Sequence, residues 1–138
     1  MHEFTQEVEE LAKAVMEYSL ERLKSNPPLD GPRSEQDLYA ELGNTITPQG
    51  LGGKQTLKVF TETLALACIS TDHPRNLAFI PSAPSEYANL FDLVVGASSL
   101  YGGSWQEGAG AVFAENQALK WLIDIAGLPK SAGGVFVQ

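Results

Sequence analysis

The sequence predicts a mainly α-helical chain, and two observations carry that prediction. Over most of its 138 residues, apolar side chains recur at steps of three and four, which is the spacing of one helix face. Stretches rich in proline and glycine separate these periodic segments and mark the loops between helices. Only residues 135–137 have the continuous apolar character of a buried strand.

Residues 4–24 are expected to form one long helix. Its apolar stripe consists of Val8, Leu11, Val15 and Tyr18, widened by Ala12 and Met16. Glutamates gather toward its start, whereas Arg22 and Lys24 stand at its end, and this order complements the helix dipole. Such a helix either covers the chain's own core or lies across a partner subunit, and the sequence leaves both alternatives open.

Residues 26–33 are expected to form a stiff linker, because their three prolines lack amide donors and restrict the residues before them. Ser34 and Asp37 then resemble a capping box with an aspartate in place of the usual glutamate. The pattern predicts a short helix that runs through Leu42 and stops at Gly43.

Residues 54–70 are predicted to form a helix that is apolar on most sides near its end and buried there. Its stripe contains Leu57, Phe60, Leu64 and Ala67. Cys68 lies in this apolar end, so we interpret it as a small buried hydrophobe. A nucleophilic cysteine would need a nearby base, and the sequence offers only His73.

Residues 77–80 are short, apolar and extended, and two prolines then hold Ser82 in a non-helical path. A helix should begin near Pro84 or Ser85, since proline is favoured in a first helical turn. The buried face of this helix is expected to hold Tyr87, Leu90, Phe91, Val94 and Val95.

Residues 96–110 combine five glycines with Tyr101 and Trp105. Glycine lets a backbone turn sharply or approach another surface closely, so aromatic residues among glycines indicate a shaped wall. Ser104 and Glu107 fit a capping box, and a helix is expected over residues 109–126.

The strand signal at residues 135–137 has no convincing partner strand in this sequence. A single buried strand cannot satisfy its own backbone hydrogen-bonding groups. We therefore expect the chain to be incomplete as a folding unit, with another polypeptide or a further C-terminal part supplying the sheet.

Composition excludes several classes of protein. Hydrophobic residues make up 43% and charged residues 19%, which excludes wholesale disorder. The net charge of −8 argues against generic binding to nucleic acid or to an anionic membrane. Cys68 is the only cysteine, and His2 and His73 are the only histidines, so an internal disulfide, a four-cysteine zinc site and a histidine-rich metal cage are excluded. The N-terminus lacks the pattern of a secretory signal, and a cytoplasmic location is expected.

No self-contained active site can be assembled from the sequence. The phosphate-loop, dinucleotide-binding and zinc-protease motifs do not occur. The six lysines all stand in polar or helix-surface contexts, whereas a lysine that forms a Schiff base needs desolvation or a cationic neighbour. No catalytic residue is therefore predicted in this chain.

Several blocks of the sequence nevertheless resemble one family in order. His73-Pro74 followed by Ala78-Phe79-Ile80-Pro81 is similar to a segment of the group II pyridoxal-phosphate-dependent amino-acid decarboxylases of the aromatic-L-amino-acid decarboxylase type. The run Gly102-Gly103-Ser104-Trp105 and the tail Gly133-Gly134-Val135-Phe136-Val137-Gln138 resemble later blocks of that family. The resemblance covers about residues 29 to 138.

The resemblance implies an α/β fold of the aspartate-aminotransferase type (fold type I) and an intertwined homodimer. Residues 1–83 would form a helical dimer clasp, and residues 84–138 would begin the large cofactor-binding domain, whose remaining C-terminal part lies outside this chain. Pyridoxal 5'-phosphate would be held mainly by residues outside this chain. The substrate would be an amino acid, with an aromatic one favoured over glutamate. As an alternative, the chain is a stand-alone, non-catalytic helical interaction module derived from that family.

The resemblance also implies site residues. Those expected to line the substrate pocket are Phe79, Pro81, Ser82, Tyr101 and Gly103. Ser82 would also approach the cofactor phosphate. Family members that act on aromatic substrates often carry a bulky aromatic residue where Gly103 stands. The glycine leaves extra room in the pocket unless Tyr101 turns in to fill it.

Overall fold

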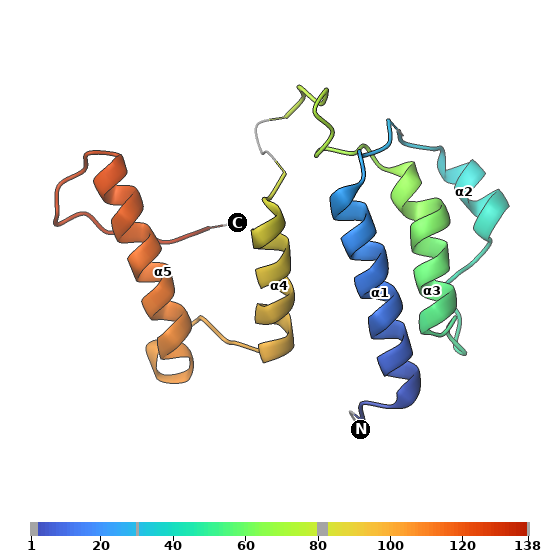
Figure 1. Cartoon of the computed structure of the whole chain (residues 1–138), viewed down its shortest axis with the longest axis horizontal. Coiled ribbons are helices and arrows are strands. Elements are labelled where there is room, and N and C mark those ends of the chain that lie inside the picture. The colour runs from blue at the N-terminus through green and yellow to red at the C-terminus, as the bar shows by residue number, and fades with distance from the viewer. Residues whose placement is uncertain (1–2, 30, 80–82, 138) are drawn as a thin grey trace. The chain divides into compact units, whose positions relative to one another are not determined.

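The computed structural model describes residues 3–29, 31–79 and 83–137, and in these ranges it is helical without strands (Figure 1). Its elements are α1 (Gln6–Lys24), α2 (Glu35–Leu42), α3 (Gly53–Val59), a π-helical turn η1 (Phe60–Leu64), a 3₁₀ turn η2 (Ala65–Ala67), α4 (Glu86–Ser98) and α5 (Trp105–Ile125). The chain divides into two compact units, a first unit of Met1–Glu86 and a second unit of Tyr87–Gln138. The predicted mainly helical character of the chain is confirmed.

Local side-chain caps explain where three of the helices begin. Thr5, Ser34 and Ser104 each precede a helix and accept a hydrogen bond from the backbone N–H three residues later. Each hydroxyl thereby satisfies one of the amide donors that a helix start leaves without a partner. α2 ends as predicted, because Gly43 adopts a φ of 63° that favours glycine.

The first unit is held together by contacts between α1 and the segment that begins with α3. The side chain of Leu11 lies directly over Gly53, where a larger residue would collide with it. Tyr18 and Phe60 pack edge to face with their ring centroids 6.3 Å apart. Ion pairs of Lys54 with Glu10 (2.9 Å) and of Arg22 with Asp72 (2.8 Å) join the same two segments.

The predicted helix over residues 54–70 is divided into α3, η1 and η2 and stops at Ala67. Thr63, in the π-helical turn, is only 5% exposed, and its hydroxyl donates a 2.7 Å hydrogen bond to Glu41. Glu41 also pairs with Arg33 at 2.7 Å, so this carboxylate connects the linker, α2 and η1. The hydrogen bond from Arg33, helped by that from Thr63, lowers the pKa of Glu41.

The second unit is built from α4, α5 and the segment that follows α5. The backbone N–H of Phe136 donates a 3.5 Å hydrogen bond to Glu115 of α5. A side chain at Gly134 would press on Leu119, with its Cβ 3.3 Å from a methyl group of that leucine. These two contacts hold residues 134–136 against α5. The strand predicted there is not formed, because no other segment pairs with it in the described ranges.

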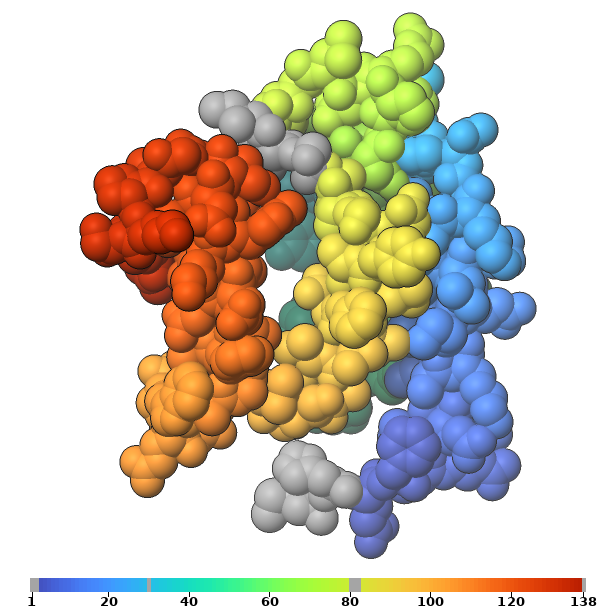
Figure 2. Space-filling model, turned by 60° about the vertical axis from the view of Figure 1, so that its left-hand side comes forward, coloured from blue at the N-terminus to red at the C-terminus, as the bar shows by residue number. Residues whose placement is uncertain are grey.

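The burial of apolar side chains is the property in which the structure differs most from the sequence-based predictions. No apolar residue in the described ranges is buried. Cys68 is exposed, so its interpretation as a buried hydrophobe is wrong for this chain, and the apolar end around it, with Leu64, Leu66 and Ile69, is exposed too. The expected buried face of α4 also stays open, and Figure 2 shows side chains of α4 (yellow) at the surface. The cause is the same in each case: the described residues supply no second layer to cover these faces.

The large accessible surface of the chain, 11,520 Å², shows how much apolar and polar surface is left uncovered. A compact monomer of 14.8 kDa would expose about 7,000 Å². Two separate compact bodies of the sizes of the two units would together expose about 8,400 Å². Even against that more generous reference, about 3,000 Å² of the surface of this chain is in excess.

None of the helices in the described residues combines the length and the apolarity that crossing a membrane requires.

Candidate functional site

Phe79 lies at the end of a turn that short-range hydrogen bonds shape. The backbone N–H of Arg75 donates to Nδ1 of His73 at 3.0 Å, and the side-chain amide of Asn76 donates to the carbonyl of Thr71 at 3.2 Å. Phe79 adopts a φ of 70°, a left-handed conformation that costs an ordinary residue about 1–2 kcal/mol. The residue is 72% exposed. Two further predicted site residues, Pro81 and Ser82, lie outside the described residues.

Tyr101 and Gly103 lie in direct contact in the second unit. A Cβ atom built on Gly103 would collide with the Tyr101 ring, and the nearest ring atoms are Oη and Cζ. The hydroxyl end of the phenol therefore covers the Cα of Gly103. In this structure Tyr101 thus lies over the position where a side chain on residue 103 would begin.

The loop of residues 99–104, here called the Tyr101 loop, is pressed onto the start of α5. A Cβ on Gly108 would collide with the backbone carbonyl of Tyr101, and a Cβ on Gly102 would touch Ala111 at 3.8 Å. Gly108 itself departs from helical geometry, with φ of −135° and ψ of 38°. The absence of a side chain at position 108 thus allows the backbone of Tyr101 to approach α5 closely.

The Tyr101 loop presents an aromatic surface. Tyr101 is 62% exposed, and Leu100 and Trp105 beside it are also exposed. In the described ranges the Tyr101 hydroxyl has no hydrogen-bond partner. Phe79 belongs to the first unit and the Tyr101 loop to the second, so each part of the predicted site is described by itself.

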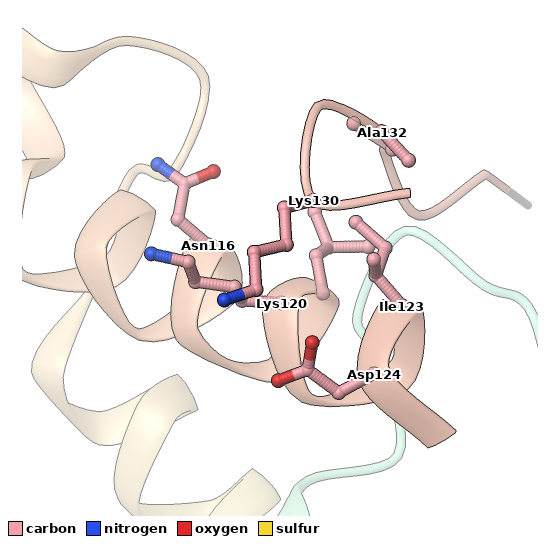
Figure 3. A pocket seen from close by; sticks show the side chains of 9 residues that line it. Asn116, Lys120, Ile123, Asp124, Lys130 and Ala132 are labelled. Carbon is pink, nitrogen blue, oxygen red and sulfur yellow. The ribbon is translucent and has the colours of Figure 1, made fainter. Parts of the chain in front are cut away.

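Sequence reasoning missed one cavity of about 560 Å³ in the second unit (Figure 3). It is lined by Asn116, Leu119, Lys120, Ile123, Asp124, Lys130, Ala132, Gly133 and Gly134. Two features of the sequence could have indicated this cavity. Asn116, Lys120 and Asp124 are four residues apart and share one face of α5, and glycines stand in the segment that follows α5. Its charged side chains are exposed, so the cavity holds no desolvated acid, base or nucleophile.

The lysines of the described ranges lack the surroundings of a cofactor-binding nucleophile. Lys13, Lys24, Lys54 and Lys58 each form an ion pair with a glutamate. For Lys54 the hydrogen bond to Glu10 raises the pKa, the opposite of what a nucleophilic amine needs. In the part of the chain that the structure describes, no three histidine, cysteine or acidic residues converge as metal ligands.

Among known proteins, the chain matches a decarboxylase. The chain is 30% identical over 120 residues, 86% of its length, to an aromatic-L-amino-acid decarboxylase of Bacillus atrophaeus. It spans about a quarter of the length of that relative. No protein-family model matches the chain, and no solved structure does. The match supports a segment related to the decarboxylases.

Proposed function

We propose that this chain is the N-terminal segment of a pyridoxal-phosphate-dependent L-amino-acid decarboxylase, a carboxy-lyase that acts on an aromatic amino acid. One observation carries the proposal: the chain exposes at least about 3,000 Å² more surface than compact bodies of its size. Permanent interfaces bury about 2,000–5,000 Å² in total, or about 1,000–2,500 Å² on each partner, so the excess on this one chain is at least as large as the area that an obligate partner covers. The match to a quarter of a decarboxylase supports the proposal that the remaining part of such an enzyme is that partner.

α4 is the clearest example of a helix whose apolar side chains no other part of the described chain covers. Its only charged residues are Glu86 and Asp92, and its large apolar side chains are all exposed. A helix that is apolar around most of its circumference is stable when other layers surround it. In the proposal, the rest of the decarboxylase chain supplies those layers and also the strands that pair with residues 135–137.

The first unit would contribute the dimer clasp. Residues 1–83 would reach the second subunit of a homodimer through the half-exposed apolar stripe of α1, which includes Val8 and Val15. Residues 84–138 would begin the large domain. The enzyme would work in the cytoplasm.

The described residues do not form a site for pyridoxal phosphate by themselves, because no lysine among them is desolvated. The cofactor would therefore be held mainly by residues outside this chain. The contribution of this chain would be the substrate-side wall, made by Phe79, Pro81, Ser82, Tyr101 and Gly103, with Ser82 also near the cofactor phosphate. Such a wall orients the substrate and keeps water away from it.

The experiment compares the chain expressed alone with the full-length protein that contains it. For the full-length protein we expect absorbance near 420 nm and release of carbon dioxide from aromatic L-amino acids, with glutamate as the control substrate. We expect the chain alone to be colourless and to associate through its apolar surface. A colourless, well-folded monomer of this chain that binds a partner without catalysis would instead support the alternative of an interaction module.

A further inference from the structure

We propose that the cavity beside α5 in the second unit is a binding site for a small organic anion, a carboxylate that carries a short apolar group. The inference goes beyond the proposed function and does not depend on it. The cavity has a volume of about 560 Å³, within the range of about 300–1,000 Å³ that is typical of small-molecule sites. It therefore has room for an organic molecule of several heavy atoms.

The cavity gathers all the positive charge of the second unit. Lys120 and Lys130 are the only basic residues of that unit, and both line the cavity. In the described ranges neither ammonium group pairs with a carboxylate, whereas all four lysines of the first unit do. Figure 3 shows both lysine side chains extending toward the same side of the cavity as Asn116, whose amide is a further donor. An anion placed there would meet two ammonium groups that have no acidic partner in the described chain.

The rest of the lining selects the kind of anion. Leu119, Ile123 and Ala132 are half-buried, whereas the charged and amide side chains are exposed, so the cavity has an apolar floor and a cationic rim. An inorganic ion would use the rim alone, whereas an organic anion uses both. Asp124 also lines the cavity and would repel a second negative charge, which favours a ligand with one carboxylate.

The wall opposite α5 is held in place by backbone hydrogen bonds. The N–H of Leu128 donates to the carbonyl of Ile123 at 3.1 Å, a bond typical of helix ends. The N–H of Ala132 donates to the carbonyl of Pro129 at 2.8 Å, so Lys130 lies within a tight turn. A wall that is formed in advance lowers the ordering cost that a ligand meets on binding.

The test titrates the full-length protein that contains this chain with sodium butyrate, followed by calorimetry at constant ionic strength. 1-Butanol supplies the apolar group without the charge, and inorganic phosphate supplies charge without the apolar group. We expect butyrate to bind more tightly than either. Absence of butyrate binding, or binding of phosphate or butanol that is as tight, would overturn the inference.

Variants of the rim make the test specific to this cavity. Lys120→Gln and Lys130→Gln should each weaken butyrate binding about three- to fivefold, the size of an exposed ion pair. Asp124→Asn should strengthen it, because the substitution removes a repulsive charge. Lys58→Gln is the matched control, since Lys58 is an exposed lysine of the first unit that lies 3.9 Å from Glu62. It should leave butyrate binding unchanged.

The outcomes are distinct, with folding of each variant checked by circular dichroism. Weaker binding in the lysine variants together with stronger binding in the aspartate variant supports the inference, because general damage to the fold would not give opposite signs. Unchanged affinity in all three cavity variants, or an equal loss in the control, would overturn it. Decarboxylation is not measured in this test, so failure of the proposed function would leave this inference standing, and the converse holds.

Discussion

The two units of this chain hold their parts together by different means. The first unit uses charge: Arg22 with Asp72 and Lys54 with Glu10 join segments that lie far apart in sequence, and Arg33 with Glu41 joins the linker to α2. The described part of the second unit contains no ion pair and relies on glycines that let backbone and side chains approach closely. We therefore expect pH and charge to affect the first unit more than the second, whereas close contacts at glycines occur in both.

Gly108→Ala should have the largest effect, because the new Cβ meets the backbone carbonyl of Tyr101, which cannot move without the loop. We expect a loss of about 1–3 kcal/mol in unfolding free energy, measured by urea denaturation. Gly110→Ala is the control: it has open space around it, and a helical alanine there should stabilise by about 0.5–1 kcal/mol. Equal effects of the two substitutions would contradict the stabilising role of the close contact between Gly108 and the Tyr101 carbonyl.

Thr63→Val should come next, in the first unit. The substitution keeps the shape of the side chain but leaves Glu41 without the hydroxyl of Thr63, so we expect a loss of about 1–2 kcal/mol. Thr61→Val, which removes a longer 3.3 Å hydrogen bond to the Lys58 carbonyl, serves as the control and should cost less. The measurement is again urea denaturation. A larger loss of unfolding free energy in the control would argue against a stabilising role of the Thr63–Glu41 hydrogen bond.

Acid should loosen the first unit before the second. Hydrogen bonds from Arg22 and Lys54 lower the pKa of Asp72 and Glu10, and Arg33 lowers that of Glu41. Carboxyls with a lowered pKa contribute stability that is present above their ordinary values near 4 and is lost as the pH falls through the folded pKa.

Amide hydrogen exchange between pH 5 and pH 2, corrected for intrinsic rates, would check this expectation. Protection in α1 and α3 should fall on acidification more than protection in α5, and Asp72→Asn should remove part of that pH dependence. An equal pH dependence of protection in both units would contradict the expectation that charge matters more in the first unit.

Glu115→Ala should have the smallest effect. The carboxylate accepts a long, 3.5 Å hydrogen bond from the N–H of Phe136, so we expect faster exchange of that amide and a stability change of about 0.5 kcal/mol or less. Glu107→Ala is a useful comparison on the same helix. Unchanged exchange at Phe136 in the Glu115 variant would show that Leu119 alone anchors the segment.

Much of the local structure was predictable because it depends on neighbours in sequence. Ser34 and Ser104 were recognised as helix caps, and Gly43 as a helix stop, from contacts that span only three or four residues. The start of α5 was placed four residues late, at residue 109, because Gly108 and Gly110 weaken the periodic signal. The π-helical turn was missed, since its Thr63 is held by Glu41, 22 positions away.

The candidate site was predictable only in part. The glycine-rich stretch indicated a shaped wall, but two placements of Tyr101 were open until the contact with Gly103 was seen. The cavity beside Lys120 was missed, because it forms only when residues 132–134 return along α5.

Most helices and their caps follow from the sequence alone, because hydrophobic periodicity and capping are short-range properties. Burial does not follow from it, and Cys68, α4 and the tail are exposed against expectation. The physical reason is that burial depends on which layers are present. A sequence pattern predicts which faces are apolar and need a neighbouring layer. Whether such a layer packs on them is seen only in the three-dimensional structure.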